Sequence, residues 1–317
     1  FNGVWSLTTQ LQYAADWPFF QLTTGRALFA GGSVAADPYY TNVIQYVDIQ
    51  TSGNTTDFGD LSNAPYYPAG AASKTRGLIA GGMTANDGTR LNVIDYVTIA
   101  NTGNATDFGD LSNSVNQLDG PGSNTRAIFG GGTTASALLN VMEYVTIANT
   151  GNASDFGDLA AANRAAAGLS SATRGVFGGG QEGSTVNRIQ YVTIETTGDA
   201  SDFGDLTSAL RDAAGSSSQT RGLFNGGSPG PVNTIQYITI ASTGNASDFG
   251  DMTISANLQS AASTHITALF AGGSGAAYFD NISSVTIATT GNSTDFGDLL
   301  VGNLGMSGCS SAHGGLA

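Results

Sequence analysis

The sequence has few cationic side chains. Lys74 is its only lysine, and 10 basic residues stand against 24 acidic ones, which gives a formal net charge of −14. A protein that binds nucleic acid needs a basic surface to neutralise phosphates, and an anionic membrane surface makes the same demand. The composition therefore argues against nucleic acid as a partner and against membrane insertion.

The sequence also lacks the marks of a disulfide framework or a membrane span. Cys309 is the only cysteine, so no internal disulfide is possible. No apolar run reaches the roughly 18 residues that a spanning helix needs. The chain starts at Phe1 rather than Met and shows no signal-peptide pattern. We therefore expect a processed or partial piece of a longer polypeptide.

One segment recurs through the chain, and its clearest copy is 92–111. Close copies occur at 42–61, 140–159, 187–206 and 233–252, with a looser one at 280–299. Each follows an apolar run that ends in two glycines, as in Arg76-Gly-Leu-Ile-Ala-Gly-Gly82. Self-similarity at this period indicates a solenoid or a propeller.

Each repeat divides into four short apolar pieces. In the second unit these are 69–73, 77–80, 93–100 and 105–111. Pieces of about four to eight residues between turn residues are typical of strands. We name them strands A to D and predict a four-stranded antiparallel unit with two apolar faces. Such a unit must stack on its neighbours, and radial stacking gives a closed propeller.

The spacings within the repeat are constant except in one loop. The repeat Tyr precedes the Phe of Asp-Phe-Gly-Asp by 12 residues, as from Tyr96 to Phe108. The next repeat Arg follows that Phe by 18 residues in four units, as from Phe108 to Arg126. Only the segment between the double glycine and the Tyr varies in length. Insertions in repeat arrays go to loops on one face, so the B–C loop is the variable one.

The double glycine followed by a Tyr and a later aromatic resembles the kelch repeat, a propeller blade of about this period. The resemblance covers residues 17–300. The sequence departs from the usual kelch pattern where Phe replaces the expected Trp. It implies an all-β, kelch-like β-propeller of four-stranded antiparallel blades, in one domain over 1–317. The repeat units are about 17–61, 62–111, 112–159, 160–206, 207–252 and 253–300. We expect 1–16 and 301–317 together to build a seventh, closing blade, with Gly314–Ala317 in the register of strand B. Six blades are the alternative.

The Asp-Phe-Gly-Asp motif admits two interpretations. Its paired carboxylates are possible calcium ligands, although the order of an EF-hand loop is absent. The favoured interpretation is structural: one Asp caps the C–D turn and the other pairs with the repeat Arg of a neighbouring strand. The residues concerned are Arg26, Arg76, Arg126, Arg174, Arg221, Asp57, Asp60, Asp107, Asp110, Asp155, Asp158, Asp202, Asp205, Asp248, Asp251, Asp295 and Asp298.

Two further motifs have simple structural interpretations. Five formal glycosylation sequons, which begin at Asn54, Asn104, Asn152, Asn245 and Asn292, all lie in the C–D turn, where turn chemistry explains the asparagine. The double glycines are followed neither by Lys-Ser/Thr nor by a helix start, so they are not phosphate-binding loops. They end strand B.

Catalytic residue types are scarce. The histidines are His265 and His313, no nucleophile-elbow pattern occurs, and a copper-radical oxidase would need more ligands. A glycosidase would have to pair isolated acids, namely Asp37, Asp87, Glu182 and Asp212. We predict no enzyme, no catalytic residue, no cofactor and no metal ligand, with calcium as the remaining possibility.

If recurring residues are scaffold, function lies where the units differ. The B–C and D–A loops emerge on one face of an antiparallel blade. Exposed aromatics beside small polar residues suit contact with a glycan or a protein. The candidate binding face carries Tyr39, Tyr40, Tyr66, Tyr67, Arg90, Glu182, Tyr278 and Phe279, with the turn at 229–231.

The full repeat, Asn-x-Ile-(Asp/Gln)-Tyr-Val-Thr-Ile-Ala-x-Thr-Gly-Asn-Ala-(Ser/Thr)-Asp-Phe-Gly-Asp-Leu, resembles kelch-like repeats of structural proteins of marine bacteriophages, cyanophages especially. The resemblance implies a virion setting: a tail fibre, capsid fibre or decoration module that contacts other virion proteins and a host surface receptor or glycan. The alternative is a secreted or cell-surface lectin-like propeller. A hydrolase is a third hypothesis and would need two carboxylates about 5–10 Å apart in a cleft.

Overall fold

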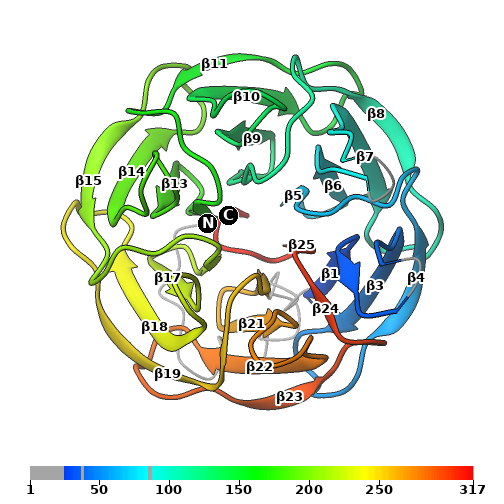
Figure 1. The fold of residues 1–317 in the computed structure, drawn as a ribbon, viewed down its shortest axis with the longest axis vertical. Helices are drawn as coiled ribbons and strands as arrows, with labels where there is room; N and C mark the ends of the chain where they lie inside the picture. The colour runs from blue at the N-terminus through cyan, green and yellow to red at the C-terminus, as the bar shows by residue number, and fades with distance from the viewer. Residues whose placement is uncertain (1–24, 37–38, 85–87, 317) are drawn as a thin grey trace, which may run out of the picture.

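The computed structural model describes residues 25–36, 39–84 and 88–316. Within these ranges all regular structure is β-strand, arranged as six sheets around one axis (Figure 1). The protein is a β-propeller of repeated antiparallel blades. In the described ranges, no helix has the length and hydrophobicity needed to cross a membrane.

The blades follow one another around the axis, and the first strand named in each blade lies nearest to that axis. Blade 1 contains β25 (Ser307–Ser310), β1 (Arg26–Ala30), β3 (Val43–Asp48) and β4 (Thr56–Asp60). Blade 2 contains β5 (Ala69–Ala72), β6 (Arg76–Ala80), β7 (Val93–Thr98) and β8 (Thr106–Asp110). Blade 3 contains β9 (Arg126–Gly130), β10 (Val141–Thr146) and β11 (Ser154–Asp158).

The remaining blades have the same order. Blade 4 contains β12 (Ala167–Ser170), β13 (Arg174–Gly178), β14 (Arg188–Thr193) and β15 (Ser201–Asp205). Blade 5 contains β16 (Ala214–Ser217), β17 (Arg221–Asn225), β18 (Val232–Thr239) and β19 (Ser247–Ala256). Blade 6 contains β20 (Ser260–Ser263), β21 (Thr267–Ala271), β22 (Asn281–Thr286) and β23 (Thr294–Asp298). A short pair, β2 (Ser33–Val34) and β24 (Asn303–Leu304), lies beside blade 1.

The number of blades corrects the favoured prediction. Seven blades were expected, with 301–317 in a closing blade of its own, but the described residues form six. Strand β25 pairs with β1, from Ala27 opposite Ser310 to Ala30 opposite Ser307, and so supplies the inner strand of blade 1. Residues Gly314–Leu316 form turns rather than a strand in the register of B. The other half of the expected blade, 1–16, lies outside the described residues.

The hydrophobic core lies between the blades. One cluster joins Ile94 and Phe108 of blade 2 to Phe129 and Val145 of blade 3, and all four side chains are buried. Each middle strand is thus covered on both faces, as the apolar character of strand C predicts. Burying an aliphatic or aromatic side chain contributes about 1.5–3 kcal/mol, so stacking the blades is the main stabilising contact.

The repeat Arg, Tyr and Phe form a stack across each of the first five blades. In blade 2 the Arg76 guanidinium carbon lies 4.8 Å from the ring centroid of Tyr96, whose ring meets Phe108 edge-on at 5.9 Å. The Nη1 atom of Arg76 donates to the carbonyl oxygens of Ile147 and Ala148 in blade 3, each at 2.9 Å. The arginine therefore links its own blade to the next one through backbone acceptors. Blade 6 has Thr267 and Ser284 at the Arg and Tyr positions.

The Arg–Asp ion pairs expected from the repeat are therefore not formed. Within the described ranges the ion pairs are Arg188–Glu182 and Arg211–Asp212, and neither involves a repeat Arg. Backbone carbonyls of the next blade take the guanidinium instead. The same arrangement holds for Arg26, Arg126, Arg174 and Arg221.

The Asp-Phe-Gly-Asp motif joins each blade to the next at the perimeter. The N–H groups of Gly103 and Ala105 in the blade 2 turn donate to the carbonyls of Phe58 and Asp60, at 2.7 and 2.8 Å. In return, the N–H of Asp60 donates to Oδ1 of Asn104 at 3.1 Å. This contact repeats at every blade junction, including the closure from blade 6 to blade 1.

The sequon asparagines therefore act as acceptors between blades. Only an acceptor oxygen is needed at this position, because Asp199 replaces Asn at one junction and accepts from Asp158 N–H at 3.0 Å. The turn interpretation of these asparagines thus acquires a contact that the sequence did not reveal.

The double glycines have a similar role near the mouth of the central channel. The N–H of Gly82 donates to the carbonyl of Val115 in the linker to blade 3, at 2.9 Å. Gly81 has a φ of +66°, and a Cβ there would lie 2.6 Å from that same carbonyl oxygen. Both the conformation and the space require glycine. The pairs end strand B, as predicted, and also attach each blade to the next linker.

Candidate functional site

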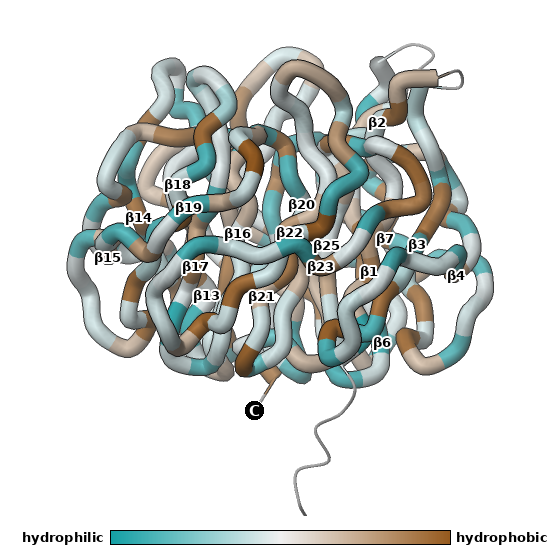
Figure 2. Tube along the Cα trace, turned by 90° about the horizontal axis from the view of Figure 1, so that it is seen from below, coloured by the Kyte–Doolittle hydropathy of each residue, from teal (hydrophilic) through white to brown (hydrophobic). Residues whose placement is uncertain are grey.

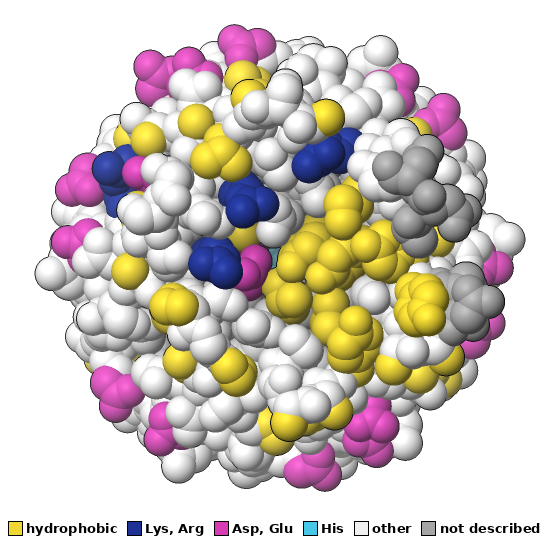
Figure 3. All heavy atoms as spheres, viewed as in Figure 1, with side chains coloured by type: hydrophobic (Ala, Val, Ile, Leu, Met, Phe, Trp, Pro, Cys, Tyr) yellow, Lys and Arg dark blue, Asp and Glu magenta, His cyan; other side chains and the backbone are white. Residues whose placement is uncertain are grey.

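The two faces of the ring differ in what they carry. Figure 2 shows β2 on one side of the disc and the C-terminal end of the chain on the other. We call the side with β2 the loop face, because the B–C and D–A loops emerge there. In Figure 3, hydrophobic side chains on this face gather at one side of a central hollow, and Lys or Arg side chains lie around its other side.

Four tyrosines of the loop face lie close together. The rings of Tyr40 and Tyr66 have centroids 5.0 Å apart, and those of Tyr66 and Tyr67 are 3.9 Å apart. Tyr278 is 40% exposed and lies close enough to Tyr40 and Tyr66 to affect their ionisation. We call Tyr40, Tyr66, Tyr67 and Tyr278 the tyrosine cluster. It brings together side chains from the linkers and loops of blades 1, 2 and 6, as the sequence predicted for one face.

The hydroxyls of Tyr66 and Tyr67 are protonated at neutral pH. Burial raises the pKa of Tyr66 to about 12, and it raises the pKa of Tyr67 still further. Tyr40, Tyr278 and Asp212 act in the same direction on Tyr66, whereas a hydrogen bond with Tyr67 lowers its pKa. A protonated phenol both donates and accepts hydrogen bonds, so the cluster offers aromatic faces together with polar hydroxyls.

The other predicted face residues have defined places. Tyr39 is 61% exposed. Arg90 donates from Nε to Asn116 Oδ1 at 3.1 Å and to the Thr133 carbonyl at 2.9 Å. Glu182 forms an ion pair with Arg188 at 3.1 Å.

Phe279 holds its loop through the backbone. Its N–H donates to the carbonyl of Gly273 at 2.9 Å, and its own carbonyl accepts from Asn303 at 3.1 Å. The half-buried ring of Phe279 directly follows Tyr278 of the tyrosine cluster in sequence. Asp37 and Asp87, which the sequence offered as isolated acids for a glycosidase, lie outside the described residues.

A closed ring of backbone hydrogen bonds surrounds the mouth of the channel. One residue of each blade, two positions before strand A, has φ between +54° and +63°. Each N–H donates to the carbonyl of the corresponding residue in the preceding blade, at 2.8–3.1 Å, and blade 1 closes the circle. These six residues, which we call the mouth ring, are Tyr67, Gln117, Ala165, Asp212, Leu258 and Gly305.

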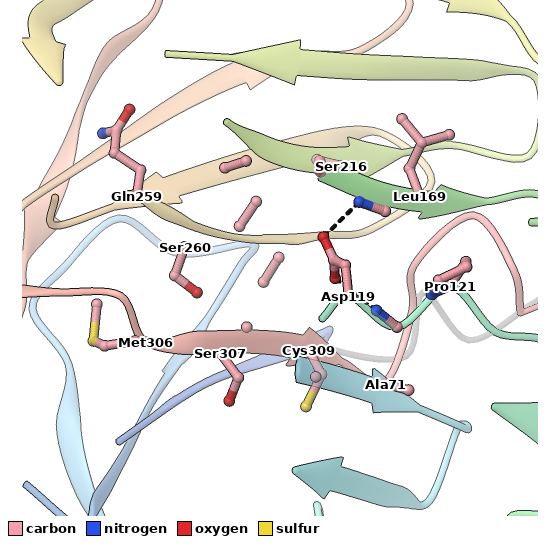
Figure 4. A pocket seen from close by; sticks show the side chains of 18 of the residues that line it. Ala71, Asp119, Pro121, Leu169, Ser216, Gln259, Ser260, Met306, Ser307 and Cys309 are labelled. Carbon is pink, nitrogen blue, oxygen red and sulfur yellow. Dashed lines mark hydrogen bonds between the residues drawn. The ribbon is translucent and has the colours of Figure 1, made fainter. Parts of the chain in front are cut away.

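Below the mouth ring lies a cavity of about 150 Å³. Its wall consists mainly of the inner strands, with Asp119 among them (Figure 4), and Asp212 of the mouth ring also lines it. The Asp119 carboxylate accepts from the N–H of Gly120 at 2.7 Å and from the N–H of Gly168 in blade 4. Burial raises the pKa of Asp119 to about 6 despite these bonds. The other blades have Ala or Ser at this position, so Asp119 is specific to blade 3.

The end of the chain closes the cavity at the opposite face. Serine hydroxyls of the inner strands donate to the carbonyl of the preceding blade, as from Ser217 Oγ to Ser170 at 2.7 Å. Blade 3 has Gly122 at this position, so no hydroxyl takes the carbonyl of Ala72 in blade 2, and Nε2 of His313 donates to that carbonyl at 2.9 Å. The N–H of Gly315 donates to His313 Nδ1 at 3.1 Å, so the imidazole is neutral with its proton on Nε2.

Arginines on the mouth were missed by the sequence analysis. Arg164 donates to Gln117 Oε1 and Gln181 Oε1, each at 2.8 Å. Arg211 pairs through Nε with Asp212 Oδ2 at 3.2 Å. The signal that could have found them is register: the residue two positions before strand A is a mouth-ring member in every unit, and Arg164 and Arg211 directly precede two of them.

Cys309 and the histidines do not assemble a nucleophile with its base. Burial raises the pKa of the Cys309 thiol to about 12, which leaves it protonated at neutral pH. Both nitrogens of His313 are used by the backbone. Within the described ranges, His, Cys, Asp and Glu side chains form no group of three that could hold a metal ion.

Comparison with known proteins adds no family. The chain matches no known family model, and a search of curated proteins finds no significant relative. The class that the structure defines is a six-bladed repeat propeller, with a tyrosine cluster and arginines at the mouth of a channel that is closed at its other end.

The acid sensitivity of the fold tests the position of His313. Burial lowers the pKa of His313 from 6.5 to about 4, because the charged imidazolium loses its hydration inside the protein. Its contribution to stability is therefore complete above pH 6.5 and is lost as the pH falls toward 4. Between pH 6.5 and 4, the free energy of unfolding of the wild type is expected to fall by up to about 3 kcal/mol more than that of His313→Gln.

Urea unfolding of both proteins at several pH values between 7 and 4 measures this difference. The comparison between the two chains is needed because Asp119, whose pKa is raised, changes stability in the opposite direction. Parallel pH profiles for wild type and His313→Gln would show that His313 is solvated in the folded state.

Proposed function

We propose that the chain is a non-enzymatic recognition module of a virion, located on a tail fibre, capsid fibre or decoration, that contacts another virion protein or the host surface through its loop face. The observation that carries the recognition role is the tyrosine cluster at the channel mouth. Partly exposed aromatic side chains with polar tips, held on a rigid scaffold, are typical of binding surfaces. The virion setting is supported by the resemblance of the repeat to kelch-like repeats of marine phage structural proteins.

Recurring and variable residues of the repeat occupy different places, which supports the same proposal. The residues that recur, such as Arg76, Tyr96, Phe108 and the Gly81–Gly82 pair, all make contacts within or between blades. The residues that differ between units collect on the loop face. A scaffold that holds variable side chains on one face is suited to recognition rather than to one fixed chemistry.

A secreted or cell-surface glycan-binding propeller is the second candidate. The tyrosine cluster favours it equally, because aromatic rings beside polar groups also suit sugars. The two candidates differ in where the protein resides and share the binding face.

Particle proteomics and an adsorption assay test the proposal together. Peptides of this chain are expected in purified particles, and the isolated propeller is expected to compete with particle attachment to host cells. Tyr66→Ala and Tyr278→Ala should weaken that competition, whereas Ile266→Ala should not. Ile266 is a matched control, since it is 52% exposed and lies on the A–B turn of blade 6, on the opposite face.

Two outcomes would contradict the proposal. If the protein occurs only in a soluble secreted fraction, the virion role fails and the lectin-like candidate takes its place. If Ile266→Ala reduces competition while the tyrosine variants do not, recognition does not occur at the loop face.

A further inference from the structure

Arg164 carries a charge that its neighbours hold in place but do not neutralise. Two of its five N–H donors are used by the neutral side-chain oxygens of Gln117 and Gln181, both at 2.8 Å. In the described part of the chain, no carboxylate lies within ion-pair distance of Arg164. Burial raises the pKa of Asp212, and Arg211 and then Arg164 act against that rise, so this carboxylate is near Arg164 without pairing with it. The nearby Arg211 differs, because Asp212 already pairs with it at 3.2 Å. Arg164 is therefore a fixed, half-buried cation with free donors.

This cation lies beside the tyrosine cluster. Gln117, which accepts from Arg164, donates its backbone N–H to the carbonyl of Tyr67 at 3.1 Å within the mouth ring. Arg164 is also close enough to Tyr67 to affect its ionisation. One edge of the channel mouth thus presents a guanidinium and the adjoining edge presents aromatic rings.

The cavity below restricts what reaches the mouth. Its volume of about 150 Å³ is smaller than the roughly 300–1,000 Å³ of most ligand pockets. Asp119 in its wall repels an anionic group when it is ionised. An anionic ligand is therefore expected to remain at the mouth, where the guanidinium of Arg164 forms no ion pair.

We propose that the channel mouth binds an acidic saccharide, with a sugar ring against the tyrosine cluster and its carboxylate on the guanidinium of Arg164. The apolar face of a pyranose suits an aromatic ring, and the planar guanidinium matches a carboxylate with two parallel hydrogen bonds. The inference rests on the proposed recognition function and names its ligand class. A neutral sugar would leave Arg164 without an ionic partner.

The overall negative charge of the chain means that any binding of an acidic sugar must be local to one site. The chain has a formal net charge of −14, so it does not attract polyanions in general. Any preference for a carboxylated sugar over its neutral counterpart must then come from a local cation. Arg164 is the residue that the geometry assigns to that role.

Calorimetric titration with defined oligosaccharides tests the proposal. The probes are oligomers of galacturonate, glucuronate and mannuronate, each compared with the same oligomer after its carboxylates are reduced to alcohols. At least one acidic oligomer is expected to bind about tenfold more tightly than its reduced form. Arg164→Gln should remove most of that preference, and Arg164→Lys should restore only part of it, because an ammonium lacks the planar fork.

Two further variants serve as comparisons. Tyr66→Ala is expected to weaken acidic and reduced oligomers alike, since it removes the aromatic face and not the charge. Arg188→Gln is the matched control: this arginine is paired with Glu182, and its loss should leave the preference unchanged. Thermal unfolding of every variant shows whether the fold is kept.

The possible results distinguish failure of the acidic-saccharide inference from failure of the recognition function on which it rests. Equal affinity for acidic and reduced oligomers, an unchanged preference in Arg164→Gln, or no binding to any of the three acidic oligomers overturns the acidic saccharide. If the tyrosine variants still reduce attachment in that case, the recognition function stands and its ligand is different. Binding of oligoglutamate as tightly as the sugar assigns the site to an acidic peptide. Saccharide binding by a chain that is absent from particles retains the site and removes the virion role.

Discussion

A chain that stops at Gly302 is expected to lose its closed ring and its cooperative unfolding transition. The deleted segment contains β24 and β25, and β25 is the inner strand of blade 1. Its loss exposes one edge of β1 and uncovers the neighbouring inner strands β5 and β20, which pack on β25. Leu304, Met306 and Cys309 are buried, and removing Met306 and Cys309 also opens the cores that blade 1 shares with blade 6 and with blade 2.

Circular dichroism and limited proteolysis measure this effect. The truncated chain should show a broad thermal transition and rapid cleavage, and a synthetic peptide of residues 303–317 should restore protection when added in excess. A chain that ends at Ser311 is the matched control, because it keeps β25 and loses only the closing turn with His313. A sharp transition near the wild-type temperature in the chain ending at Gly302 would show that closure by β25 is not required.

Gly81→Ala is expected to destabilise the fold by about 3 kcal/mol. An alanine in the left-handed region costs about 1–2 kcal/mol. The new methyl group would also lie 2.6 Å from the carbonyl oxygen of Val115, and such overpacking adds about 1–3 kcal/mol. For a chain of this length the melting temperature should fall by about 5 °C.

Differential scanning calorimetry of Gly81→Ala beside Gly53→Ala provides the measurement. A Cβ at Gly53 meets no atom within 4 Å, and its backbone is not in the left-handed region, so this control should melt within about 1 °C of wild type. Equal melting temperatures for the two variants would contradict the role assigned to the double glycine in joining blade to linker.

The sequence predicted what depends on neighbours within one unit. Strands such as 77–80 and 93–100 are readable from short apolar runs between turn residues, and their pairing follows from the shortness of the connections. The double glycine after strand B marks a real strand end. Candidate residues such as Tyr66 and Tyr278 could be placed on one face. Successive antiparallel strands run in opposite directions, and this alone decides the side on which each loop emerges.

Contacts between units could not be read in the same way. The partner of β1 is β25, about 280 residues further along the chain, and nothing in either segment identifies the other. The prediction that Arg76 pairs with a repeat Asp was wrong, because a backbone carbonyl accepts a hydrogen bond from its guanidinium. A backbone carbonyl is present in every residue and so leaves no signature in the sequence. The meeting of Arg164 with Gln117 depends on the tilt between two blades, which the repeat pattern does not specify.

The mouth ring has no first or last member. Every residue in it both donates and accepts, so no blade can shift at the mouth without breaking bonds on its two sides. A single backbone conformation is adopted there by six different residue types, from Tyr67 with its phenol to Gly305, which has no side chain. New specificities can therefore arise by exchanging these side chains while the rim keeps its diameter. A ligand that binds such a rim loses little of its binding free energy to ordering the protein, because the protein is ordered before the ligand arrives.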